Sequence, residues 1–364
     1  MTYPKLLGMP SEQISTPRDF EETTPRRSVR LEDIAQQVGV SRSEVSRVLN
    51  GRQRAGRSVG SEKRLRIQQV AQELGYQPNK AAQNLVHGRT DMVGLLLKSE
   101  DSDELAPHHH EIIAALTHTL TEQGFHLLLH QWSPAANDAL LRLVRARTCD
   151  VLVLTDMRRD DPRPVLLRQL GQPFVIRGSA PEPGMLAVGM DNQAVGRLAV
   201  ETLVRYGHRR ILFQNIGRDF MAGEGRYQGY QAACAEYGLE ETLHYEDQVW
   251  GEERVYAYIL ERFAQPDPPT AIFVTDELTA LGVLRALTER GKRVPEDVSL
   301  LTCLNARFMR RILPQVSTIH LHQYDVAAEL GRLVVRLLSG EPVELKQLFL
   351  APTLEERGSC AVLK

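Results

Sequence analysis

Residues 30–50, RLEDIAQQVGVSRSEVSRVLN, constrain the fold more than any other stretch of the chain. The apolar residues of a first helix recur at helical spacing: Leu31, Ile34, Ala35 and Val38. Gly39 is placed to end this helix, and Ser41 and Glu44 have the spacing of a capping box that starts a second one. The second helix has its own apolar stripe at Val45, Val48 and Leu49. Two short helices with a glycine between them predict a helix-turn-helix.

The exposed side of the second helix carries the candidate DNA contacts. In a helix-turn-helix, the N-terminal face of that helix enters the major groove. The candidate residues on it are Ser41, Arg42, Ser43, Ser46, Arg47 and Asn50. Arginine can pair with O6 and N7 of guanine, and serine can bond a base edge or a phosphate. The alternative is an ordinary helical hairpin with a solvated, charged face.

The distribution of charge favours DNA binding, although the total charge does not. Between residues 26 and 90 there are thirteen lysines and arginines and five acids, a net charge of +8. The whole chain of 364 residues carries −2, so the other residues carry −10. A basic module on an acidic body is typical of a DNA-binding domain joined to a separate second domain. The stretch 61–74 predicts a third helix whose apolar residues pack on the first two: Leu65, Ile67, Val70, Ala71 and Leu74.

From residue 91 onward the pattern changes to alternating strands and helices. Buried strands are predicted at Val93–Leu97, His126–His130, Val151–Thr155, Phe174–Ile176, Ile211–Gln214, Ala271–Thr275 and Val298–Cys303. Amphipathic helices are predicted at 111–123, 137–147, 192–206, 224–237, 252–264 and 277–290. This repetition predicts parallel sheets covered by helices, with enough length for two lobes and a ligand cleft at the carboxyl ends of the strands. Val316–Leu321 and a helix at 325–339 are expected to return the chain to the first lobe.

The motif V-S-x-x-x-V-S-R-V-L-N at 40–50 resembles the N-terminal signature of the lactose-repressor (LacI/GalR) family of bacterial transcription regulators. Residues 74–88, LGYQPNKAAQNLVHG, are similar to that family's hinge, and the resemblance continues to about residue 358. It implies a small all-α helix-turn-helix domain followed by a two-lobed α/β domain similar to periplasmic sugar-binding proteins. It also implies hinge contacts to DNA from Asn79, Ala82 and Leu85, with Leu85 as an apolar wedge in the minor groove. A plain linker is the alternative.

Residues 189–211, GMDNQAVGRLAVETLVRYGHRRI, match the family pattern almost position by position. Asp191 and Asn192 are expected to cap a helix rather than to bind a ligand. His208 is expected to be structural, because no base or nucleophile partner is apparent near it.

The resemblance implies an effector site in the cleft between the lobes. Its candidate residues are His109, Arg177, Arg226, Trp250, Asp276 and Asn305. Arg226 stands where the family places the arginine that grips the effector, and a guanidinium can hold two hydroxyls or a carboxylate. Trp250 stands where some members place a ring against a sugar face, with a core role as the alternative. His109 has a solvated position as its alternative.

Two substitutions weaken the expectation of a sugar effector. Thr275 replaces a ligand-bonding asparagine, and Leu304 occupies the position of a common effector-binding aspartate. Three adjacent histidines at 108–110 cannot share one helical face, so no metal site is expected, and no cofactor is expected either.

Other sequence features exclude several classes of protein. The four cysteines form no CxxC pair, which predicts reduced thiols. No run of about eighteen apolar residues and no export signal occurs, so a cytoplasmic, nucleoid-associated protein is expected and a membrane partner is not. The sequence contains no GxSxG, HExxH or P-loop, so an enzyme is not expected.

The expected domains are a disordered tail at 1–25, a helix-turn-helix domain at 26–76, a hinge at 77–90, a two-lobed effector-binding and dimerisation domain at 91–358 and a C-terminal tail at 359–364. The leading hypothesis is a homodimeric repressor that binds a pseudo-palindromic operator in double-stranded DNA, with its affinity set by a small, sugar-like effector. One alternative is a regulator without a small effector or controlled by a protein partner. A soluble sugar receptor without DNA function is the other.

Overall fold

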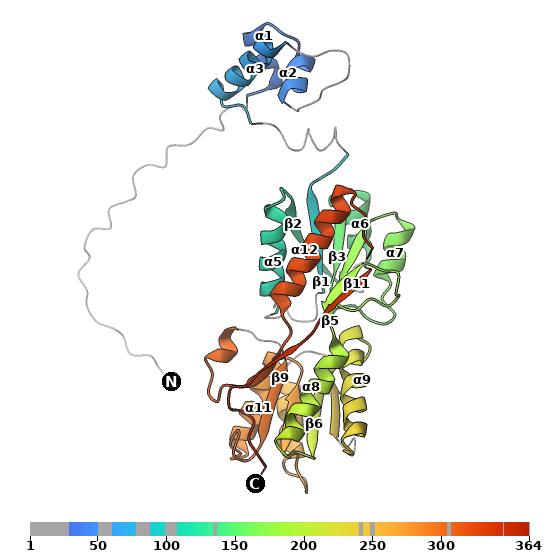
Figure 1. Cartoon of the computed structure of the whole chain (residues 1–364), viewed down its shortest axis with the longest axis vertical. Helices are drawn as coiled ribbons and strands as arrows, with labels where there is room; N and C mark the ends of the chain where they lie inside the picture. Colours follow the sequence, from blue (N-terminus) through green and yellow to red (C-terminus); the bar gives the residue numbers. More distant parts are fainter. Residues whose placement is uncertain are drawn as a thin grey trace, which may run out of the picture. The chain divides into compact units, whose positions relative to one another are not determined.

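The computed structural model describes residues 29–49, 60–77, 88–98, 108–133, 137–239, 243–247, 252–303, 307–344 and 346–363. The chain divides into two compact units, Met1–Gly88 and Arg89–Lys364. Figure 1 shows a small helical unit and a larger α/β unit. Most of the predicted hinge at 77–90 lies outside the described residues, as does the predicted tail at 1–25.

Within residues 29–49 and 60–77, the N-terminal unit contains three helices: α1 (Leu31–Val38), α2 (Arg42–Leu49) and α3 (Ser61–Glu73). They enclose a core made of Ile34, Ala35, Val45, Val48, Ile67, Val70 and Ala71. Gly39 ends α1 with φ of 76°, a left-handed conformation that costs little without a side chain. The expectation for Leu65 was wrong, because its side chain is 67% exposed. The predicted helix-turn-helix is therefore present, with one fewer packing residue.

The first lobe of the larger unit is built on a six-stranded sheet in the order β11-β5-β4-β3-β1-β2, whose neighbours are all parallel. The strands are β1 (Met92–Lys98), β2 (His126–Trp132), β3 (Val151–Leu154), β4 (Phe174–Arg177), β5 (Ala187–Met190) and β11 (Gln347–Leu350). Its helices are α5 (His109–Thr121), α6 (Asn137–Arg145), α7 (Arg163–Gln169) and α12 (Gln323–Ser339).

The second lobe has a sheet in the order β12-β10-β9-β8-β6-β7, parallel except where β10 meets β12. The strands are β6 (Ile211–Ile216), β7 (Leu243–Asp247), β8 (Ala271–Val274), β9 (Ser299–Cys303), β10 (Ser317–His320) and β12 (Thr353–Glu355). Its helices are α8 (Asn192–Arg205), α9 (Met221–Glu236), α10 (Glu252–Arg262), α11 (Glu277–Glu289) and a 3-10 turn, η2 (Arg307–Arg310).

The chain crosses between the lobes three times: from β5 to α8, from β10 to α12 and from β11 to β12 (Figure 1). The two predicted lobes with parallel sheets are therefore confirmed, and both are discontinuous in sequence. The predicted return strand at 316–321 is β10, which stays in the second sheet, so α12 makes the return instead. No helix of the described chain is long and apolar enough to span a bilayer.

The last described residues belong to the second lobe, where the sequence predicted a tail at 359–364. Ser359 and Cys360 are buried. The amide of Ser317 donates to Ser359 Oγ at 2.7 Å, and the amide of Ala361 donates to Ser299 Oγ at 3.0 Å. These bonds attach the segment to the first residues of β9 and β10, where it pairs polar groups at the strand ends that would otherwise be left unpaired.

Helices α8 and α9 approach so closely that two glycines are needed between them. A Cβ atom on Gly196 would lie 2.0 Å from the carbonyl oxygen of Arg226, and one on Gly229 would lie 1.9 Å from that of Gln193. Real contacts of this kind do not occur, so the helix backbones would have to move apart if either glycine carried a side chain.

Gly196→Ala is therefore expected to lower the free energy of unfolding by about 1–3 kcal/mol, because an overpacked helix interface must separate. Urea unfolding followed by circular dichroism measures the change. Gly184→Ala is the matched control, since a Cβ atom there meets nothing within 4 Å. Equal unfolding midpoints for the two variants would contradict the role given to Gly196.

Candidate functional site

The start of α2 is fixed by a reciprocal pair of hydrogen bonds. The amide of Ser41 donates to Glu44 Oε2 at 3.0 Å, and the amide of Glu44 donates to Ser41 Oγ at 3.3 Å. These bonds from Ser41 lower the pKa of Glu44, so the carboxylate stays ionised near the positive end of the helix dipole. The predicted capping box is present, and it gives Ser41 a structural role in addition to its predicted DNA contact.

The face of α2 opposite its core carries the predicted DNA-binding side chains. Arg42 and Ser43 are exposed, and Ser46 and Arg47 are half-buried. Arg42 Nε lies 3.0 Å from Glu32 Oε1, a surface ion pair that holds the arginine only weakly. Arg47 Nε donates to the carbonyl of Ser43 at 3.3 Å. Three predicted base-contacting side chains, those of Arg42, Ser43 and Arg47, therefore remain accessible on one short helix. The other predicted DNA contacts, Asn50, Asn79, Ala82 and Leu85, lie outside the described residues.

A cavity lies between the two lobes of the larger unit. Its walls are formed by His108, Asp156, Met157, Arg177, Gly178, Ser179, Ile216, Phe220, Met221, Ala222, Arg226 and Gln323. Several of these residues end or directly follow β3, β4 and β6. The cavity thus lies at the carboxyl ends of parallel strands, where ligands of open α/β sheets bind. Two predicted effector residues, Arg177 and Arg226, come together in it from opposite lobes.

Arg226 is held by the helix pair α8–α9. Its side chain is 6% exposed. Its Nε donates to Asn192 Oδ1 at 3.1 Å, and Nη1 donates to the carbonyl of Thr275 at 3.4 Å. Asp191 caps α8 as predicted, since its Oδ1 accepts from the amide of Ala194 at 3.0 Å. Asn192 does not cap the helix. It orients the arginine, a role that the sequence did not reveal.

Asp156 is a cavity residue that the sequence did not single out. It follows β3 with φ of 52°, a strained conformation for a residue other than glycine. Its Oδ2 lies 2.7 Å from the Thr155 hydroxyl and 3.7 Å from His109 Nε2. Burial alone would raise the pKa of Asp156, but its interactions with His109 and His108 lower it, so the side chain is a carboxylate at neutral pH. The one signal in the sequence for Asp156 was its position directly after the predicted strand Val151–Thr155.

The histidines at the start of α5 lie beside this carboxylate. His108 and His109 are both buried, with ring centroids 4.4 Å apart. His108 lines the cavity, whereas His109, the predicted effector contact, reaches Asp156 instead. Potential ligand atoms of these two histidines and Asp156 lie within 4.8 Å of one another and could hold a metal ion. Arg177 and Arg226 disfavour a metal ion here, because their positively charged guanidinium groups line the same cavity and repel a cation.

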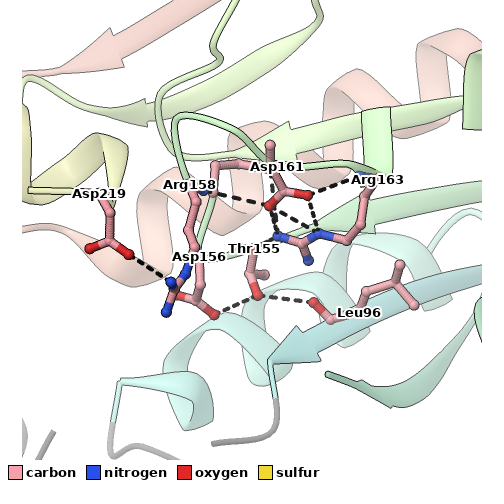
Figure 2. A network of polar contacts seen from close by, with 8 residues as sticks. Leu96, Thr155, Asp156, Arg158, Asp161, Arg163 and Asp219 are labelled. Carbon is pink, nitrogen blue, oxygen red and sulfur yellow. Dashed lines mark hydrogen bonds and ion pairs between the residues drawn. The ribbon is translucent and has the colours of Figure 1, made fainter. Parts of the chain in front are cut away.

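A loop of the first lobe, held by a network of polar contacts, reaches the second lobe beside the cavity (Figure 2). Arg163 is fully buried, pairs with Asp161 at 2.6 Å and donates to the carbonyl of Thr155 at 2.7 Å. The loop fixed in this way carries Arg158, whose Nη1 lies 2.6 Å from Asp219 Oδ2 of the second lobe. Beside this pair the amide of Met221 donates to the carbonyl of Met157 at 2.9 Å. Direct bonds thus join the lobes next to the cavity.

The other predicted effector residues, Asp276, Trp250 and Asn305, are not among the described residues that line the cavity. Asp276 is buried and caps α11, because its Oδ1 accepts from the amide of Thr279 at 2.8 Å. Burial raises the pKa of Asp276 despite these bonds and the nearby Arg226. Trp250 and Asn305 lie outside the described residues, as does Leu304. The ring nitrogens of His208 lie 3.1 Å from Thr270 Oγ1 and 2.8 Å from Ser299 Oγ, an arrangement typical of a structural histidine.

Comparisons with known proteins agree with both units. Residues 30–79 match the family model described as bacterial regulatory proteins, lacI family, and residues 200–360 match a periplasmic binding protein-like domain. The HTH-type transcriptional regulator CelR of Thermobifida fusca is 33% identical over 344 residues, which cover 92% of this chain and 99% of that protein. The chain belongs to the lacI family of bacterial regulatory proteins. The HTH-type transcriptional repressor PurR of Mannheimia succiniciproducens is 30% identical over 313 residues, 85% of this chain and 90% of that protein.

Solved structures of the lacI family have the same fold. A complex of the transcriptional regulator CelR with cellobiose aligns with a TM-score of 0.69 at 30% identity, covering 91% of this chain and 99% of that chain. The Lac repressor dimer bound to operator and the anti-inducer ONPF aligns with a TM-score of 0.79 at 21% identity, covering 92% and 100%. The named relatives are transcriptional regulators and not enzymes, as the sequence predicted.

The stability of this lacI-family chain is expected to fall as the pH drops below about 6.5, the unperturbed histidine pKa. Burial, with a further contribution from His109, holds the pKa of His108 well below that value, against the opposing effect of Asp156. The folded state therefore stays neutral at His108 while the unfolded chain takes up a proton. The neighbouring charges of Arg177 and Arg226 act in the same direction as burial.

Urea unfolding midpoints measured between about pH 7.5 and 5 test this expectation. His108→Gln is expected to flatten the decline, because a neutral amide takes up no proton. His110→Gln is the control, since His110 is exposed in the same turn of α5. Equal slopes for wild type and His108→Gln would show that His108 is not the residue responsible.

Proposed function

We propose that this protein is a sequence-specific transcriptional repressor that binds a pseudo-palindromic operator as a homodimer. The observation that supports this best is the anchored helix α2, whose core side holds it in the three-helix unit while Arg42, Ser43 and Arg47 remain accessible. A dimer presents two such helices to DNA, so the two-fold axis of the protein has to coincide with that of the operator.

A small molecule in the interlobe cavity is proposed to set the affinity for the operator. The cavity joins polar side chains from both lobes, among them Asp156, Arg177 and Arg226. A molecule that contacts both lobes binds one relative arrangement of them better than another, and it therefore shifts the population between the two. A sugar-like effector is supported by the cellobiose that the CelR structure contains.

A regulator without a small effector, or one controlled by a protein partner, is the second candidate. One observation favours it: Thr275 and Asp276, two positions where the family resemblance implies effector contacts, are both buried and bonded within the protein. Calorimetry with sugars, sugar phosphates and nucleosides separates the two candidates, because the second predicts no heat of binding from any of them.

Selection of duplexes from a random library by the purified full-length protein is expected to yield a pseudo-palindrome. Arg47→Ala is expected to reduce the preference for that site over random duplex by about 1–3 kcal/mol, because an arginine–guanine pair is lost. Competition gel shifts measure the preference. Arg66→Ala is the charge-matched control, since Arg66 is exposed on α3 and not on α2. Selection without any enriched sequence would refute operator recognition.

Arg226→Met is expected to remove the response to effector while leaving operator binding intact. The substitution removes the guanidinium that Asn192 orients toward the cavity but leaves an unbranched, apolar side chain on α9. Gel shifts with the selected operator, with and without an effector identified by calorimetry, measure the response. A variant that still responds as wild type does would show that the effector binds elsewhere.

A further inference from the structure

The charges that face the interlobe cavity are not balanced. Its ionisable lining residues are His108, Asp156, Arg177 and Arg226. Arg177 ends β4 in the first lobe, and Arg226 lies on α9 in the second. His108 is held neutral by burial, so two guanidinium groups from opposite lobes share the cavity with one carboxylate. The described residues of the lining therefore carry a net charge of +1.

Neither arginine forms an ion pair within the part of the chain that the structure describes. Arg226 donates to an amide oxygen and to a backbone carbonyl, both neutral. The Nε atom of Arg177 is buried and has no hydrogen-bond partner among the described residues. By contrast, the buried Arg163 has Asp161 at 2.6 Å, and Arg158 has Asp219 at the same distance. Burying a cation without a counter-charge costs free energy. Binding of an external anion beside such an arginine offsets that cost.

The nearby carboxylates only partly compensate the two arginines. Asp156 accepts from Thr155 and faces His109. Asp276 is near Arg226 but is taken up by Thr279, and burial raises its pKa. The two arginines also disfavour each other, since burial and the charge of Arg226 lower the pKa of Arg177 against the pull of Asp156. This repulsion acts across the space between the lobes.

We infer that the effector of this protein carries an anionic group, a carboxylate or a phosphate, which Arg177 and Arg226 hold together from opposite lobes. This inference rests on the proposed function, because an anion bound here is an effector only if the protein is a regulator. Guanidinium groups match carboxylate and phosphate oxygens in a bidentate manner, and such charge-assisted bonds are stronger than those to hydroxyls. Asp156 and the neutral His108 remain to bind hydroxyl groups of the same molecule.

An anion in this position couples binding to the arrangement of the lobes. Without a negative charge between them, Arg177 and Arg226 favour separation of the lobes. With it, each arginine gains an oppositely charged partner only when both lobes are close. The anion thus binds the closed arrangement better than the open one, which is the differential affinity that a population shift requires.

Titration calorimetry of the full-length protein with glucose, glucuronate, glucose 6-phosphate and inorganic phosphate tests the inference. At least one anion is expected to bind roughly 10–100-fold more tightly than glucose, the range that charged hydrogen bonds provide. Arg177→Gln is expected to remove this preference, and Arg177→Lys is expected to keep part of it, because lysine retains the charge but not the planar fork. The helix-turn-helix unit also attracts anions, but neither variant changes that contribution.

Arg168→Gln is the matched control, because Arg168 lies in the same lobe, is exposed and pairs with Glu182 at 2.9 Å. It is expected to bind anions as wild type does. The inference is overturned if glucose binds as tightly as its anionic counterparts, if no anion in the set binds, or if Arg177→Gln and Arg177→Lys both bind anions like wild type. Gel shifts with the selected operator are run on the same preparations, so a failure of operator binding is recognised separately from a failure of anion binding.

Discussion

The hydrogen bond from Arg226 to Asn192 depends on how closely α8 and α9 pack. Gly196 and Gly229 remove the side chains that would keep the two helix backbones apart. Because α9 lies so near the start of α8, Arg226 reaches Asn192 at 3.1 Å and is oriented at the cavity wall. The position of one charged group is thus determined by two residues that have no functional side chain at all.

The first lobe positions its cavity residue Asp156 by a different means, a buried ion pair in the loop after β3. Arg163 pairs with Asp161 and lies over the ring of Trp132, with 4.3 Å between Cζ and the ring centroid. The charge of this buried cation is balanced by Asp161, so Arg163 stiffens the loop that follows β3 instead of attracting an anion. The same loop carries Asp156 into the cavity and Arg158 to the second lobe (Figure 2). The cavity wall at Asp156 and the lobe contact at Arg158 therefore belong to one loop.

Much of this fold follows from the periodicity of apolar residues, and the failures have physical reasons. The long buried strands, such as β1 and β9, were predicted because continuous apolar runs stand out. Strands β5, β7, β11 and β12 were missed, and length is not the reason, because β3, β4 and β8 have four residues each and were predicted. Strands β11 and β12 are edge strands that mix polar and apolar residues, and neighbouring strands supply their partners. The prediction that Leu65 is buried also failed. Its spacing in the helix is compatible with a buried position, but the packing of three short helices leaves it exposed.

The site was less predictable than the fold because its chemistry depends on pairing in space. The sequence pointed to Arg177 and Arg226 but could not show that they meet in one cavity, nor that Arg163 is neutralised while they are not. It also could not show that Asp156 is the only carboxylate among the described residues of the lining. The contact between Arg158 and Asp219 holds the lobes together next to the place where Arg177 and Arg226 repel each other. Two opposing electrostatic interactions therefore act on the relative arrangement of the lobes beside the cavity, and a charge bound between the arginines changes only one of them.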